Sequence, residues 1–353
     1  MTLAPSLPEL LARARADLRM GVPVVLGVAL VLAVEGLSAA RLADVRVLGM
    51  PVLAITARRA QTLKARAYDG DVARIAVPAV ADVAWLMAVA NPVDDLRMPL
   101  KGPLTTLRDG PADAHRAALM LCKAAYLLPA ALVVDAPEGF AARHGLTALP
   151  LSAVTQDTSP LHPIIAARVP MVASTAGRVH VFRPEDGGEE HYAVEIGRPD
   201  RNAPVLARVH SACFTGDVLG SLKCDCGPQL RTALAQMGVQ GAGVLLYLNQ
   251  EGRGIGLANK LRAYALQDQG FDTVEANHRL GFEDDERDFR IGANILRQMG
   301  FTSVRLMTNN PRKIAMMESC GITVTERVPL HVGQTLQNEG YLATKAAKSG
   351  HIL

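Results

Sequence analysis

The sequence predicts an α/β (α+β) protein of two domains. Its 353 residues are more than one hydrophobic core usually serves. Along residues 1–160, apolar runs typical of strands alternate with apolar residues at helical spacing. After a turn-rich linker, placed at residues 161–174, the pattern becomes richer in strands. Residues 175–353 are therefore expected to form a second domain, a mixed sheet with flanking helices.

The first domain begins with a helix and a strand. The stretch Ser6-Leu-Pro-Glu9 has the pattern of a capping box, with a proline in the first turn, and Gly21 ends the helix. The apolar run Val22–Val34 follows and is predicted as one buried strand, with Gly27 inside it. Taken alone, residues 1–160 contain no acidic cluster, phosphate loop or metal-ligand spacing, so they indicate no chemistry.

Composition excludes some classes of partner. The net charge is +3, and no long run of lysine or arginine occurs, so we expect no nucleic-acid partner. An anionic partner is better sought as a small molecule held by a few local cations.

The run Val22–Val34 is also the only candidate for membrane insertion or export. Its thirteen residues are fewer than the roughly 20 that a bilayer-spanning helix needs. Three arginines precede it, as in a signal peptide, but two acids dilute their charge and the stretch before it is helical. We therefore expect no membrane partner and a cytoplasmic protein.

The second domain opens with strand-like segments. Residues 177–182 and 191–196 alternate like half-buried strands, and the charged turn between them suggests a hairpin. Another strand, at 205–210, leads the chain to a group of cysteines.

Three of the five cysteines fall within fourteen residues, as Cys213, Cys224 and Cys226. With no sign of secretion, such thiols favour a metal over a disulfide. Three sulfurs leave a tetrahedral Zn²⁺ one position open, as in catalytic zinc sites. A chance cluster, or a structural site closed by a distant histidine, would give the same spacing. Cys122 and Cys320 lie in apolar helical surroundings and are expected to be reduced packing residues.

Further along, a strand at 244–248 runs into the glycine-rich stretch 249–256 and then a helix at 257–269. This junction suits phosphate or base binding by backbone N–H groups, although an ordinary turn explains it equally well. Tyr264 lies on the apolar face of that helix, which by itself indicates a core tyrosine. Five acids surround one arginine at 283–288, as in a solvated loop before a helix. The helix that starts at Pro311 carries two basic residues in its first turn and would suit a phosphate.

From about residue 175 to 345 the chain resembles GTP cyclohydrolase II. The segments that carry the resemblance are long and specific, and they are Arg208-Val-His-Ser211, Cys213-Phe-Thr-Gly-Asp217, Ser221-Leu-Lys-Cys-Asp-Cys-Gly227, Gln250-Glu-Gly-Arg253, Lys260-Leu-Arg-Ala-Tyr-Ala-Leu-Gln-Asp-Gln-Gly270, Asp272-Thr-Val-Glu-Ala-Asn277 and Thr308-Asn-Asn-Pro-Arg-Lys313. The resemblance implies hydrolysis of GTP with release of formate and pyrophosphate, the first committed step of riboflavin synthesis. It also implies one Zn²⁺ per subunit, Mg²⁺ on the triphosphate and a homodimer.

The resemblance assigns roles to individual residues. Cys213, Cys224 and Cys226 would hold the zinc, and Tyr264, Asp285 and Arg287 would be catalytic. The residues that would line the nucleotide site are Arg208, Val209, His210, Ser211, Gln229, Glu251, Gly252, Arg253, Thr273, Thr308 and Lys313.

These roles agree with the chemistry of the residue types. Asp285 would move protons between water and the purine, and Tyr264 would donate to a leaving nitrogen or orient water. The family is described with the residue at Arg287 as a nucleophile toward the α-phosphorus. A guanidinium normally stays protonated, so charge stabilisation is the physically easier role for Arg287.

The first domain resembles 3,4-dihydroxy-2-butanone-4-phosphate synthase, which is often fused to this enzyme, at Ala14–Leu26 and Ala136–Leu146. That family has an acidic metal-binding loop after its first strand, whereas residues 27–35 here offer only Glu35. One carboxylate cannot replace several in holding Mg²⁺. We therefore expect a degenerate, non-catalytic domain kept for packing, dimerisation or regulation. Ala212 is a second departure, because the family usually has glutamate there, and it puts in doubt a nucleotide contact or a tuning role rather than the metal.

Two rivals remain open. A relative of the same fold would stop at a formylated product or use another purine nucleotide. A binding or regulatory protein would instead close a structural zinc with a fourth ligand, for which His210 and His278 are nearest in sequence.

Overall fold

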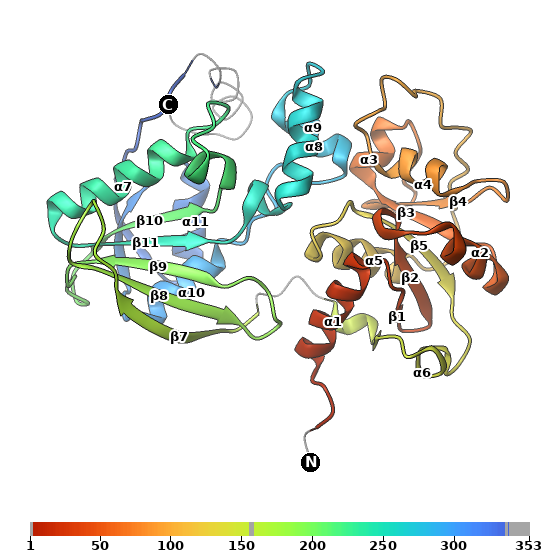
Figure 1. Ribbon diagram of the computed structural model, residues 1–353, viewed down its shortest axis with the longest axis horizontal. Helices are drawn as coiled ribbons and strands as arrows, with labels where there is room; N and C mark the ends of the chain where they lie inside the picture. The colour runs from red at the N-terminus through yellow and green to blue at the C-terminus, as the bar shows by residue number, and fades with distance from the viewer. Residues whose placement is uncertain (1–2, 155–158, 336–337, 339–353) are drawn as a thin grey trace. The chain divides into compact units, whose positions relative to one another are not determined.

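The computed structural model describes residues 3–154, 159–335 and 338. Two mixed sheets with helices on their faces make up the described chain, which confirms the predicted fold class (Figure 1).

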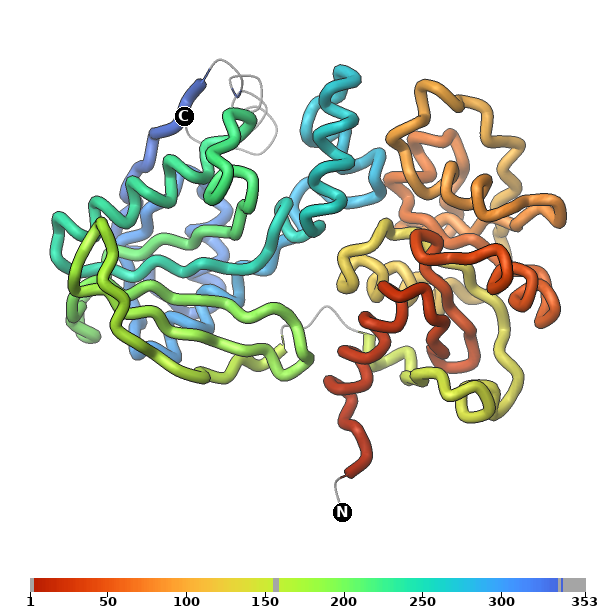
Figure 2. The backbone as a smooth tube through the Cα atoms, in the orientation of Figure 1, coloured from red at the N-terminus to blue at the C-terminus, as the bar shows by residue number. Residues whose placement is uncertain are grey.

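The chain divides into two compact units (Figure 2). Unit 1 comprises Met1–Asp157 together with Ile255–Glu286, and unit 2 comprises Thr158–Gly254 together with Arg287–Leu353. The segment Ile255–Glu286, which the sequence placed in the second domain, thus packs with the first.

Unit 1 contains a six-stranded sheet in the order β4-β3-β5-β2-β1-β6. Its strands are β1 Val24–Leu26, β2 Ala29–Ala33, β3 Val52–Thr56, β4 Val72–Ala76, β5 Ala130–Asp135 and β6 Ala148–Leu149. Neighbours are antiparallel except β1 and β6, which are parallel. The run predicted as one strand is therefore a hairpin, which turns at Gly27 with a left-handed φ of 61°.

Helices cover both faces of this sheet. They are α1 Leu7–Arg19, α2 Ala39–Leu48, α3 Ala57–Thr62, α4 Val83–Ala90, α5 Asp113–Ala124, α6 Phe140–His144, α8 Leu257–Gln267 and α9 Thr273–Leu280, with 3-10 turns at Val34–Gly36 and Leu151–Ala153. Successive β2 side chains alternate between two cores, because Leu30 and Leu32 pack with α2, α4, α8 and α9, whereas Val31 packs with α1 and α5. The predicted capping box is confirmed, since the N–H of Ser6 donates to Glu9 at 2.6 Å.

Unit 2 contains a seven-stranded sheet in the order β13-β12-β10-β11-β9-β8-β7. Its strands are β7 Leu161–Arg168, β8 Gly177–Pro184, β9 His191–Ile196, β10 Val205–Ser211, β11 Gly243–Leu248, β12 Ser303–Met307 and β13 Thr323–Val328. The four strands from β13 to β11 are parallel, and β11, β9, β8 and β7 pair antiparallel. The β8–β9 hairpin was predicted, but β7 occupies much of the stretch predicted as linker.

The remaining helices flank this second sheet. They are α7 Cys226–Gln240, α10 Arg290–Gln298 and α11 Pro311–Ser319, with a π-helical turn at Phe214–Val218 and a 3-10 turn at Glu251–Gly254. Helix α7 packs on one face, and α10 and α11 pack on the other. No helix in the described ranges is both long and apolar enough to cross a bilayer.

The topology identifies an edge of unit 2 where a ligand site is expected. The chain leaves β10 toward β11 on one side, and β12 lies on the other side of β10. In parallel sheets, ligands bind outside the carboxyl ends of strands where the strand order reverses in this way. Ser211, Asn249 and Thr308 lie at or just after these three strand ends.

Candidate metal and nucleotide site

Three cysteine sulfurs converge just after the carboxyl end of β10. The Sγ atoms of Cys213, Cys224 and Cys226 all lie within 4.8 Å of one another, and Cys213 Sγ is 3.7 Å from Cys224 Sγ. Two sulfurs bound to one tetrahedral Zn²⁺ at about 2.3 Å would lie ~3.8 Å apart. All five cysteines are free thiols. The sulfur geometry therefore fits a metal better than a disulfide.

The backbone around the sulfurs leaves little space. A Cβ atom at Gly216 would lie 2.7 Å from Cys224 Sγ and 3.1 Å from Cys213 Sγ. Gly227 is equally confined, because its Cβ would lie 2.1 Å from the carbonyl oxygen of Gly216. These glycines allow the π-helical turn and the start of α7 to bring the cysteines together.

The thiols affect one another's ionisation. Hydrogen bonding with Cys213 raises the pKa of Cys224. Hydrogen bonds with Cys213 and Cys224, together with burial, raise the pKa of Cys226 well above its usual range. A bound divalent cation would reverse this effect by favouring the thiolates.

No fourth cysteine, histidine, aspartate or glutamate joins the cluster within the residues that the structure describes. His210 instead faces Asp217, and His278 pairs with Asp284 in unit 1 at 2.7 Å. Neither histidine therefore supports the closed structural site that was one rival interpretation.

Asp217 has a buried side chain and belongs to a segment of the family resemblance, but it had no predicted role. Its carboxylate accepts hydrogen bonds from the backbone N–H of Cys213 at 3.0 Å and from the Tyr247 hydroxyl at 3.0 Å. The His210 ring nitrogen Nε2 lies 3.1 Å from both carboxylate oxygens. Burial lowers the pKa of His210, and Asp217 partly opposes this effect. The spacing from Cys213 to an acid four residues later was the available sequence signal.

A buried arginine connects β10 to α7. Arg208 donates from Nη1 to the carbonyl oxygen of Met307 at 3.0 Å and from Nη2 to Gln229 Oε1. Gln229 in turn donates to Asp225 at 2.6 Å. Burial lowers the pKa of Arg208 to about 10, and its buried Nε has no hydrogen-bond partner in the described chain. An unsatisfied buried donor suits an acceptor on a ligand.

Two further cations meet at one aromatic ring. Lys313 Nζ lies 4.9 Å and the Arg287 guanidinium carbon 4.8 Å from the ring centroid of Phe289. Lys313 also donates to the carbonyl oxygen of Val209 at 2.9 Å, and Arg287 donates to the Ser211 hydroxyl at 3.4 Å. The structure thus gathers Val209, Ser211, Arg287 and Lys313 around the end of β10.

The glycine-rich stretch forms a strained turn beside the cysteine loop. Gly252 and Arg253 both adopt left-handed φ values, 64° and 62°. For a residue with a side chain this conformation is uncommon and is often found at functional sites. Glu251 accepts a hydrogen bond from the N–H of Phe214 at 2.5 Å, which ties this turn to the residue after Cys213.

Thr308 is buried at the end of β12. Its hydroxyl accepts a hydrogen bond from the N–H of Asn310 at 3.0 Å, and Asn310 caps α11 through the N–H of Arg312 at 2.9 Å. The start of the helix that carries Lys313 is therefore fixed by these two residues.

Three predicted site residues belong to unit 1. Tyr264 is half-buried in α8, with Lys260 Nζ 5.8 Å from its ring centroid. Thr273 opens α9 and accepts a hydrogen bond from Gln267 at 3.3 Å. Asp285 is half-buried in the segment between α9 and α10.

Comparison with known proteins identifies relatives. Residues 163–329 match the family described as GTP cyclohydrolase II. A protein of Azospirillum brasilense named GTP cyclohydrolase-2 is 46% identical over 312 residues, which cover 86% of this chain and 81% of that protein. A protein of the same name from Azotobacter vinelandii is 58% identical over 175 residues, covering 50% of this chain and 84% of that protein.

Among solved structures, RibBX of A. baumannii, a two-domain 3,4-dihydroxy-2-butanone 4-phosphate synthase, is 16% identical with a TM-score of 0.30. The match covers 91% of this chain and 99% of that one. The Azospirillum match is longer than the part of the chain that follows Asp157, so it extends into the N-terminal half.

Proposed function

The chain belongs to the GTP cyclohydrolase II family, and from this premise we propose that it hydrolyses GTP at the three-cysteine site. The reaction opens the imidazole ring, releases formate from C8 and pyrophosphate from the triphosphate, and gives 2,5-diamino-6-hydroxy-4-(5-phosphoribosylamino)pyrimidine. This is the first committed step of riboflavin biosynthesis. The observation that carries the proposal is the convergence of three cysteine sulfurs within 4.8 Å, at the sheet edge where Arg287 and Lys313 also meet.

Cys213, Cys224 and Cys226 would hold one Zn²⁺ per subunit. Their spacing, the confined backbone at Gly216 and the absence of a fourth protein ligand in the described ranges support a site with an open position. When bound, such a metal lowers the pKa of a coordinated water so that hydroxide is available near neutral pH. Hydroxide is the nucleophile that ring opening at C8 requires.

The cations around Phe289 would bind the triphosphate, together with Mg²⁺. Arg287 and Lys313 are held in place by Ser211, the carbonyl of Val209 and the aromatic ring. Both would stabilise the negative charge that grows as pyrophosphate leaves. For Arg287 we propose charge stabilisation rather than nucleophilic attack, because a guanidinium normally stays protonated.

Arg208 and Gln229 would orient the nucleotide. Two guanidinium nitrogens of Arg208 are already engaged, and its buried Nε–H, which has no partner in the described residues, would donate to the nucleotide. His210 would position the cysteine loop through Asp217, and the turn at Glu251, Gly252 and Arg253 would contact the nucleotide. Thr308 would act by fixing the start of α11.

Tyr264, Thr273 and Asp285 would complete the site. Asp285 accepts a proton from the attacking water and returns it to a ring nitrogen, and Tyr264 donates to the leaving nitrogen or orients water. Thr273 would contact the nucleotide. All three residues lie on Ile255–Glu286, the segment that belongs to the family match and packs into unit 1.

The decisive experiment is turnover of GTP by the full chain loaded with zinc and supplied with Mg²⁺. Formate, pyrophosphate and the diaminopyrimidine should appear in equal amounts, and a Cys224→Ala variant should form none of them. A formylated pyrimidine without free formate would instead indicate the partial reaction.

X-ray absorption of the zinc protein should show three sulfurs and one lighter ligand; a fourth protein ligand without turnover would indicate a structural metal. We also expect a homodimer, which light scattering can test.

A further inference from the structure

The segment Ile255–Glu286 lies within the family match but is built into the core of unit 1. Leu257 and Leu261 are exposed, but other apolar residues of the segment are almost completely buried, with Leu266 and Ala276 at 0% exposure and Leu280 and Phe282 at 1%. They share one core with residues from the sheet and helices of the N-terminal half, among them Leu53, Ile55, Ala60, Leu86, Val89 and Leu128. Burial of this extent fixes α8 and α9 against the N-terminal half.

Two glycines of the segment allow its backbone to approach very closely. A Cβ atom at Gly256 would lie 2.8 Å from Tyr126 Cβ, and one at Gly281 would lie 2.8 Å from Thr56 Oγ1 and 2.9 Å from Pro129 Cγ. Asn259 also donates to the carbonyl oxygen of Tyr126 at 3.1 Å. The segment therefore packs against residues 56 and 126–129 as tightly as elements within one domain pack against one another.

Two ion pairs attach the segment to the N-terminal half, and each lies close in sequence to Tyr264 or Asp285. Arg262, two residues before Tyr264, donates to Glu35 at 2.6 Å. Lys123 donates at 2.5 Å to Glu286, the residue after Asp285. Side chains in both pairs are 20–27% exposed, so solvent screens them less than the more exposed Arg58–Glu283 pair.

Glu35 has a second partner in the N-terminal half. It accepts a hydrogen bond from the N–H of Leu128 at 2.9 Å, which orients its carboxylate toward Arg262. Lys123 likewise makes a second contact with the segment, since its Nζ lies 5.7 Å from the ring centroid of Phe282.

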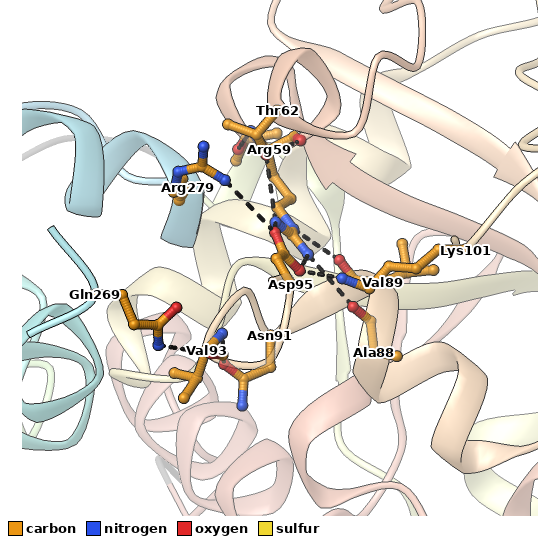
Figure 3. A network of polar contacts seen from close by, with 11 residues as sticks. Arg59, Thr62, Ala88, Val89, Asn91, Val93, Asp95, Lys101, Gln269 and Arg279 are labelled. Atoms are coloured by element: carbon orange, nitrogen blue, oxygen red, sulfur yellow. Dashed lines mark hydrogen bonds and ion pairs between the residues drawn. The ribbon is translucent and has the colours of Figure 1, made fainter. Parts of the chain in front are cut away.

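Figure 3 shows a third point of attachment, near the carboxyl ends of α8 and α9. Asp95 is held by the buried Arg59, whose Nη2 lies 2.9 Å away, and by Lys101. Arg279 of α9 approaches the same carboxylate at 3.9 Å. Gln269, just after α8, donates to the carbonyl oxygen of Val93 at 2.8 Å.

We propose that the N-terminal half is a positioning platform for the segment Ile255–Glu286, and that Glu35 and Lys123 are positioning residues for the reaction. Glu35 acts through Arg262 on Tyr264, and Lys123 acts through Glu286 on Asp285. This inference rests on the proposed function, because it takes Tyr264 and Asp285 as the groups that move protons. It gives the N-terminal half a role in turnover, although the sequence predicts no chemistry for that half.

The test uses the full chain and exchanges the charges of one pair. Lys123→Glu places two carboxylates together, and Lys123→Glu with Glu286→Lys restores an opposite pair; Lys123→Gln is a milder variant in case the first folds poorly. Arg97→Ala is the matched control, because it removes an ion pair of unit 1 whose side chains are 85% and 58% exposed. Each variant is measured for kcat and KM with GTP, zinc content, and amide hydrogen exchange of residues 255–286.

For Lys123→Glu we expect kcat to fall ~10–100-fold with little change in KM, because misplacing a catalytic group by about 1 Å costs up to ~100-fold. Exchange in residues 255–286 should rise while zinc content stays constant. The double variant should recover most of both, and Arg97→Ala should match the wild type. Unchanged kcat and exchange in Lys123→Glu and Lys123→Gln would overturn the platform. A wild-type chain that does not turn over GTP would contradict the proposed function, and exchange alone would then show whether the platform holds the segment.

Discussion

Asp217 Oδ2 lies 3.0 Å from the backbone nitrogen of Cys213 and accepts its hydrogen bond. The same carboxylate contacts His210 and Tyr247, whose rings stack with centroids 5.5 Å apart. His210 and Tyr247 are direct partners on β10 and β11. The loop that starts at Cys213 is therefore fixed to two neighbouring strands through one acid.

Replacing Asp217 should loosen this loop. We expect Asp217→Ala to lower zinc affinity ~10–100-fold, the usual effect of removing a partner that orients metal ligands. Competition with a chromophoric chelator measures the affinity. Tyr247→Phe removes one of the hydrogen bonds and keeps the carboxylate, so its effect should be smaller. Wild-type zinc affinity in Asp217→Ala would contradict this role.

Gly216 should tolerate no side chain. In Gly216→Ala the new methyl group would lie 2.7 Å from Cys224 Sγ, which is closer than packed atoms allow, so the sulfurs must separate. We expect loss of stoichiometric zinc while the far-ultraviolet circular dichroism stays native. Gly220→Ala is a suitable control, because its φ of 65° makes alanine strained although no atom lies within 4 Å of the added carbon. If both variants bind zinc equally, crowding at the sulfurs is not the limiting factor.

Gln229 should matter through Arg208. In Gln229→Leu the buried Nη2 of Arg208 loses its acceptor, which costs about 1–3 kcal/mol in a buried site. The guanidinium would then reorient, and we expect KM for GTP to rise more than kcat falls. Gln229→Glu keeps an acceptor for Arg208, although it can no longer donate to Asp225, so its KM should rise less than that of Gln229→Leu. Steady-state kinetics on both variants, at equal zinc content, measure the two KM values. Equal KM values would argue against Gln229 acting through Arg208.

The strands and helices of unit 2 were largely predictable because their signals are local. The alternation at 177–196 gave the β8–β9 hairpin, and Pro311 marked the start of α11. The Cys213, Cys224 and Cys226 spacing also predicted a shared cluster correctly, since a short loop limits how far apart its ends can lie.

Other features depend on contacts that sequence spacing does not contain. The run Val22–Val34 is apolar throughout, so alternation could not reveal that it folds back at Gly27. The packing of Ile255–Glu286 into unit 1 depends on long-range contacts. In the sequence this segment shows only apolar residues at helical spacing, which would suit packing in either unit. The contacts of Asp217 with His210 on β10 and Tyr247 on β11 depend on the pairing of these strands, which residue spacing does not predict.

His191 should make the stability of unit 2 depend on pH. Its ring is 5% exposed, and Nδ1 accepts a hydrogen bond from the N–H of Asn249 at 3.1 Å, so this nitrogen must be unprotonated. Burial lowers the pKa of His191 to about 4, whereas in the unfolded chain it is about 6.5. Between these values the unfolded state binds the proton and the folded state does not. The contribution of His191 to the free energy of unfolding is therefore complete above pH ~6.5 and is lost as the pH falls toward ~4, by about 2 kcal/mol between pH 7 and pH 5.

Amide hydrogen exchange in β9–β11 at pH 7 and pH 5 measures this loss of stability. His191→Gln should flatten the dependence, and His162→Gln, at a ring that is 57% exposed, should not; an unchanged slope in His191→Gln would assign the pH effect to other groups.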